Sequence, residues 1–146
     1  MLSKHKIIAL ILIFSIILPS LFSCTYKPPK IEDYEWKMRS IVHSENGQVV
    51  YDAVSEEYNA NIEAPIINII LVAIGGEITI TDFTNNKAYK GTYALSAKTP
   101  KGTDYHITLE GKSGYATVAM TKYADGKEEP TLPIAIDGYS IYFYAE

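Results

Sequence analysis

Residues 76–123 read GEITITDFTNNKAYKGTYALSAKTPKGTDYHITLEGKSGYATVAMTKY. Apolar and polar residues alternate along this stretch in runs that Gly, Asn, Pro and Lys separate. A period of two is typical of strands that bury one face, and the separating residues are typical of tight turns. The stretch therefore predicts successive strands, with turns at Asn85 and Asn86, at residues 100–102 and at residues 112–114.

The strand pattern continues on both sides of this stretch. Upstream, it predicts strands over residues 34–43, 48–51 and 66–74, while residues 52–65 suggest a helical turn or a flap. Downstream, the pairs Asp125–Gly126 and Asp137–Gly138 are hairpin signals that precede strands over residues 131–136 and 139–145. Because proline cannot donate to a β-ladder, Pro130 and Pro133 predict that residues 131–136 form an edge or irregular strand.

About eight or nine short strands thus follow one another with no room for crossover helices. Such connections join antiparallel neighbours, and closure into a barrel is a common way to remove exposed edges. The sequence therefore predicts an all-β fold, an antiparallel up-and-down barrel of about eight strands, preceded by an N-terminal signal helix and an extended tether.

The first residues have the pattern of a secretory signal. Lys4 and Lys6 precede residues 7–18, which are apolar apart from one serine. This core is shorter than the roughly 20 residues that span a bilayer, which favours a cleaved signal over a permanent span. Leu21, Ser23 and Cys24 then resemble the lipobox of bacterial lipoproteins. The resemblance implies cleavage between Ser23 and Cys24, and diacylglycerol with palmitate-type chains on Cys24.

Three segments follow from this interpretation: a signal peptide over residues 1–23, lipidated Cys24 and a Pro-containing tether over 24–33, and a barrel domain over 34–146. Cleavage removes two of the 13 basic residues and none of the 17 acidic ones. An acidic balance argues against nucleic acid and against adsorption to anionic headgroups. We expect membrane contact through the lipid on Cys24 alone, on the extracytoplasmic side of a cell membrane or outer membrane.

The mature chain also carries a second pattern. It consists of an early strand tryptophan (Trp36), a strand ending at Asp82, the block YKGTY at residues 89–93, GYAT at residues 114–117, and a terminal aromatic strand. This order resembles small bacterial lipoproteins with lipocalin-like domains. The resemblance implies a barrel whose apolar interior can hold a small molecule, and it implies no enzymatic activity.

Aromatic residues supply the candidate binding residues. On four separate strands of the expected barrel, Trp36, Tyr93, Tyr105 and Tyr115 are candidates for contact with a ligand. The final strand carries two rows, Tyr142 and Tyr144 on one face and residues 139, 141 and 143 on the other. If the barrel closes, one row points outward as an aromatic strip for a partner or for glycan stacking.

Catalytic and metal motifs are not evident in the sequence. His43 and His106 lack the short spacing of metal ligands, and His106 shares a polar face with Asp104 as an expected solvated pair. We therefore expect no metal, no cofactor and no catalytic residue. Two functions stay open: a non-enzymatic module that binds a small apolar or amphipathic ligand, and an envelope protein-interaction module (inhibitor, immunity or assembly factor) that acts through exposed tyrosines. A third, an enzyme using Glu56, Glu57 or Glu63, is disfavoured.

Overall fold

The computed structural model describes residues 27–52 and 68–146. The expected signal peptide, Cys24 and most of the 52–65 segment lie outside the described residues. The described part contains a short 3-10 helix, η2, and nine strands. Their bounds are η2 Ile31–Asp33, β1 Trp36–His43, β2 Val49–Asp52, β3 Ile69–Ile74, β4 Glu77–Asp82, β5 Lys87–Thr99, β6 Gly102–Leu109, β7 Lys112–Lys122, β8 Glu128–Ile136 and β9 Tyr139–Ala145.

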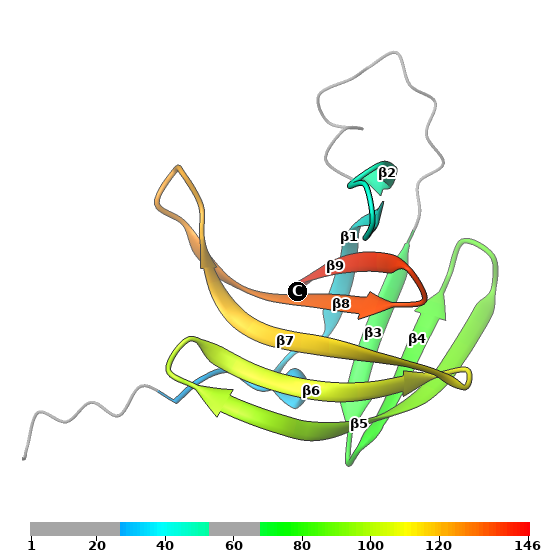
Figure 1. Cartoon of the computed structure of the whole chain (residues 1–146), viewed down its shortest axis with the longest axis horizontal. Coiled ribbons are helices and arrows are strands. Elements are labelled where there is room, and N and C mark those ends of the chain that lie inside the picture. The colour runs from blue at the N-terminus through cyan, green and yellow to red at the C-terminus, as the bar shows by residue number, and fades with distance from the viewer. Residues whose placement is uncertain (1–26, 53–67) are drawn as a thin grey trace, which may run out of the picture.

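Eight of these strands close into an antiparallel barrel (Figure 1). From β3 to β9 each strand pairs with the next, and β1 closes the ring because it pairs with both β3 and β9. The C-terminal part of β1 pairs with β2 in place of β3, and β2 extends the sheet beyond the ring. The predicted fold class, an all-β antiparallel up-and-down barrel of eight strands, is confirmed.

Tight turns join successive strands from β3 to β9, and one of them differs from the prediction. Glu110 and Gly111 connect β6 to β7 with φ of 49° and 78°, the backbone of a two-residue hairpin turn. The turn predicted at residues 112–114 is therefore wrong, because these residues begin β7. Gly114 is required there for a different reason: a Cβ on it would collide with the Ala135 carbonyl oxygen of β8.

Of the two alternatives predicted near the prolines, the edge strand is wrong, and the irregular strand is confirmed at one point. β8 is a central strand that pairs with β7 on one side and β9 on the other. The β7–β8 ladder keeps one register but has a gap between Ala116↔Ile134 and Ala119↔Thr131, where Pro133 lies. Proline has no N–H, so the sheet loses a local ladder bond at this position and continues beyond it.

Side chains pack closely in the described part of the barrel interior. Fully buried residues come from strands all around the ring and include Trp36, Leu71, Val118, Leu132 and Ile134. A side chain beside an empty space large enough for water would carry accessible surface, and these carry almost none. Small residues such as Ala73 and Ala116 are buried beside the larger ones. The interior around these residues is therefore a packed core.

Substitution of Gly91 tests how closely β5 and β6 approach each other. It lies between Ile78 of β4 and Leu109 of β6, and a Cβ on it would overlap the Thr108 carbonyl oxygen. We expect Gly91→Ala to lower the free energy of unfolding by about 2–3 kcal/mol, because β5 and β6 must move apart. Urea unfolding measures this loss. The exposed control Thr92→Ala should change stability by less than about 0.5 kcal/mol, and an equally mild Gly91→Ala would contradict the close approach.

Candidate functional site

The segment before β1 closes one end of the barrel. Ile31, the first residue of η2, is fully buried in the core. The Trp36 indole nitrogen donates to the Ile31 carbonyl oxygen at 2.8 Å, and the Ile31 amide donates to the Tyr105 hydroxyl at 3.2 Å. The Tyr93 hydroxyl donates to the Glu32 carboxylate. Residues 31–33, assigned to the tether in the sequence, thus form a plug that belongs to the barrel domain.

Three of the four candidate ligand-binding residues meet at this plug. Trp36, Tyr93 and Tyr105 hold the chain at residues 31 and 32, and the Tyr93 and Tyr105 rings lie edge to face at 5.6 Å. Burial, followed by the hydrogen bond to Glu32, raises the pKa of Tyr93 to about 12. Their polar atoms therefore bind the protein's own backbone and side chains.

The fourth candidate lies elsewhere. Tyr115 points to the outer face of β7, is 63% exposed, and contacts the His106 ring at 4.9 Å. The expected pair of His106 and Asp104 does not form a contact of its own: Asp104 accepts from the Thr117 hydroxyl at 2.8 Å, and His106 lies 3.3 Å from the Ser96 hydroxyl. Both side chains are thus engaged by neighbouring hydroxyls on the barrel wall.

A groove of about 380 Å³ lies on the outer face of the barrel. Tyr142 and Tyr144 line it from β9, where they alternate with buried Phe143. The Tyr142–Tyr144 row is therefore the outward one, and Tyr142 is 41% exposed. The groove as a whole is lined by residues of β1, β7, β8 and β9, together with the first residue after β7: Arg39, Ser40, Thr121, Tyr123, Thr131, Pro133, Tyr142, Phe143 and Tyr144.

Arg39 reaches this groove because of an irregularity in β1. The β1–β9 register shifts between Met38 and Ser40, which leaves Arg39 as an extra residue, a β-bulge. Its guanidinium lies 3.6 Å from the Glu129 carboxylate, donates to the Tyr123 hydroxyl at 3.2 Å, and sits 5.5 Å from the centre of the Tyr123 ring. The alternation of faces along β1 could not predict which side Arg39 occupies, because the bulge interrupts that alternation.

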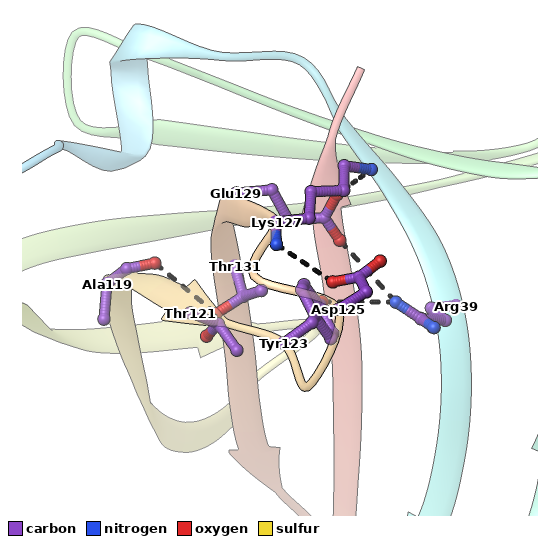
Figure 2. Close-up of polar contacts among 8 residues, drawn as sticks. All are labelled: Arg39, Ala119, Thr121, Tyr123, Asp125, Lys127, Glu129 and Thr131. Carbon is purple, nitrogen blue, oxygen red and sulfur yellow. Dashed lines mark hydrogen bonds and ion pairs between the residues drawn. The ribbon is translucent and has the colours of Figure 1, made fainter.

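Glu129 is the centre of a polar network beside the groove (Figure 2). Lys127 lies 2.7 Å from its carboxylate, opposite the contact with Arg39. The turn that brings Lys127 there is closed by the Lys127 amide, which donates to Asp125 at 2.9 Å. The hydrogen bond from Lys127, then that from Tyr123, lowers the pKa of Glu129, while burial raises the pKa of Tyr123. The network ties β1 to the β7–β8 hairpin across β9.

Two further hollows lie among the described residues. One of about 180 Å³ lies beside the plug and is lined by Lys30, Glu32, Tyr93, Leu95, Lys98 and Tyr105. Another, of about 430 Å³, has a polar lining that includes His43, Asp137 and Tyr139. Within residues 27–52 and 68–146, no three His, Cys, Asp or Glu side chains are grouped to hold a metal ion. The same residues contain no helix that is both long and apolar enough to cross a membrane.

Comparisons with known proteins give no family for the chain. No protein-family model matches it, no curated protein matches it, and no solved structure matches it.

The Glu129 network predicts a pH-dependent stability. A lowered carboxyl pKa stabilises the folded protein above the unfolded value of about 4.5, and this stability is lost as pH falls through the folded pKa. We expect Glu129→Gln to lower the free energy of unfolding at pH 7 and to match the parent protein at strongly acidic pH. Urea unfolding from pH 7 to pH 3 measures the difference. Exposed Glu128 provides the control, since Glu128→Gln should leave the profile unchanged; a pH-independent Glu129→Gln effect would contradict the ion-pair account.

Proposed function

We propose that this protein is a lipid-anchored extracytoplasmic module that binds an extended segment of an envelope protein in its outer groove. The observation that carries the proposal is the groove of about 380 Å³ formed around Tyr142 and Tyr144. Its size falls within the range of about 300–1,000 Å³ of ligand sites. Lys4, Lys6, Leu21, Ser23 and Cys24 support the export and anchoring part of the proposal.

The composition of the groove suits a polypeptide. Tyrosine rings and Pro133 offer apolar area that needs little ordering on binding, and extended or proline-rich peptides dock in aromatic-lined grooves. Arg39 stands at one side with only one guanidinium nitrogen engaged by Glu129 and Tyr123. Its remaining donors can bind a carbonyl or carboxylate of the segment. An apolar extended segment with an acceptor near Arg39 therefore fits the groove.

The interior offers less to a ligand than the groove does. A module that holds a small apolar molecule within the barrel would need a cavity there, but the side chains around Trp36, Val118 and Leu132 leave almost no accessible surface. The plug residue Ile31 occupies the interior end nearest Tyr105. These observations favour the protein-interaction module over the small-ligand module among the two functions considered from the sequence.

Site-specific photocrosslinking in cells that produce the full chain tests this function. A photoreactive phenylalanine in place of Tyr142 should yield a covalent adduct whose crosslinked peptides map to one contiguous segment of one envelope protein. The same probe in place of Tyr115 is the matched control, because Tyr115 is an exposed aromatic residue on another part of the outer surface. It should yield no such adduct.

A second substitution decides whether the groove itself captures the segment. Adding Tyr144→Ser to the Tyr142 probe chain should reduce the adduct about ten-fold, the effect of losing a typical aromatic hot spot. Equal adducts at positions 142 and 115, adducts scattered over many proteins, or an adduct with the mass of a sugar or small molecule would each overturn the proposal.

A further inference from the structure

The small hollow beside the plug places two lysines together. Lys30, just before η2, and Lys98, near the end of β5, line the hollow of about 180 Å³ together with Leu95. Leu95 is 54% exposed although it is a large apolar residue. Figure 1 shows the chain before η2 passing beside the β5–β6 turn. This lysine hollow therefore lies at the end of the barrel where the tether enters.

Some lysines on the barrel wall are ion-paired, and others, including the two lysines of the hollow, are not. Lys37, Lys112, Lys122 and Lys127 each have a carboxylate within 4 Å. Among the described residues, neither the Lys30 nor the Lys98 ammonium has such a partner. The one acid of the hollow, Glu32, already accepts the Tyr93 hydroxyl. Lys27 and Lys101 add two exposed lysines, one on the entering chain and one in the β5–β6 turn.

The proposed anchor lies close to the hollow in the sequence. Cys24 comes three residues before Lys27, and an extended chain spans at most about 3.6 Å per residue, so the lipid attachment point lies within about 11 Å of Lys27. Charges interact with little screening over about 8 Å at physiological ionic strength. Lys27 thus lies close to the bilayer surface that would hold Cys24, and Lys30 of the hollow follows three residues later on the same chain.

We propose that the lysine hollow binds the phosphate headgroups of anionic phospholipids and seats the tether end of the barrel on the bilayer. This inference rests on the anchoring part of the proposed function. The acidic net charge of the chain argues against adsorption in general, but lipid recognition depends on local lysines near the surface. Leu95, an exposed residue in the lining of the same hollow, adds an apolar contact at the headgroup boundary.

Lysine labelling in vesicles tests the inference. The full-length gene product, purified in its processed form, is inserted through its lipid into vesicles of phosphatidylcholine alone or of phosphatidylcholine with phosphatidylglycerol. A water-soluble acylating reagent then labels exposed lysines, and mass spectrometry reads each site. Lys30 and Lys98 should be labelled at least five-fold less in the anionic vesicles. Lys90, an exposed lysine of the same strand, should be labelled equally in both.

A variant that lacks both lysines and a control with inorganic phosphate make the test more specific. Lys101, in the adjacent β5–β6 turn, should also be labelled less in the anionic vesicles when the parent chain is used. It should lose this protection in Lys30→Gln/Lys98→Gln and keep it in Lys90→Gln. Equal protection of Lys30 and Lys98 in both vesicle types would overturn the inference, because the anchor alone would then cover them. Protection by inorganic phosphate in neutral vesicles would also overturn it, since the site would then take free phosphate.

The intact mass of the purified chain separates this inference from the proposal beneath it. A chain that carries diacylglycerol and floats with both vesicle types, yet shows no dependence on phosphatidylglycerol, overturns the lysine hollow and leaves the anchor standing. A chain whose mass lacks diacylglycerol overturns the anchor, and with it the seating of the barrel on the bilayer.

Discussion

The hydrogen bonds that fix Ile31 inside the barrel are the constraint on which the rest of the structure depends. Trp36 and Tyr105 bind the carbonyl and amide of one residue, so a buried backbone group is satisfied on both sides. Without the plug, these two polar tips would be buried with no partner, at a cost of roughly 1–3 kcal/mol each. With it, the aromatic residues that could have lined a ligand site complete the core instead. The same plug sets where the tether enters and which end carries the lysine hollow.

Because the described interior is packed, the proposed binding site lies on the outer wall of the barrel. The alternation that buries Phe143 turns Tyr142 and Tyr144 outward, and the β-bulge at Arg39 breaks the period so that a guanidinium reaches their groove. The Glu129 carboxylate contacts Arg39 through one oxygen and Lys127 through the other. Exposed ion pairs contribute little stability one by one, but this network spans three strands and fixes the position of a donor beside apolar rings. A fixed donor costs less ordering when a partner binds.

The sequence predicted what local periodicity determines and missed what depends on distant contacts. Period two and tight turns were enough for the barrel, its antiparallel order and the two faces of β9. Gly114 was interpreted as a turn residue because glycine marks turns, yet it serves a close strand approach. Pro130 and Pro133 predicted an edge or irregular strand, but β8 is a central strand whose ladder with β7 has only a local gap. Residues 31–33 have the composition of a tether, and the partners that bury Ile31 include Tyr105, 74 positions away. Arg39 and Glu129 meet only because β1 closes the ring beside β9.

Native-state hydrogen exchange of the Ile31 amide tests the central claim, that the plug is part of the barrel core. Ile31 should exchange with the free energy of global unfolding, as the most protected amides of the barrel core do, because its N–H is released from Tyr105 only when the barrel opens. Exchange of Ile31 at the rate of an exposed loop, with the barrel core still protected, would contradict the account and leave the interior open at this end.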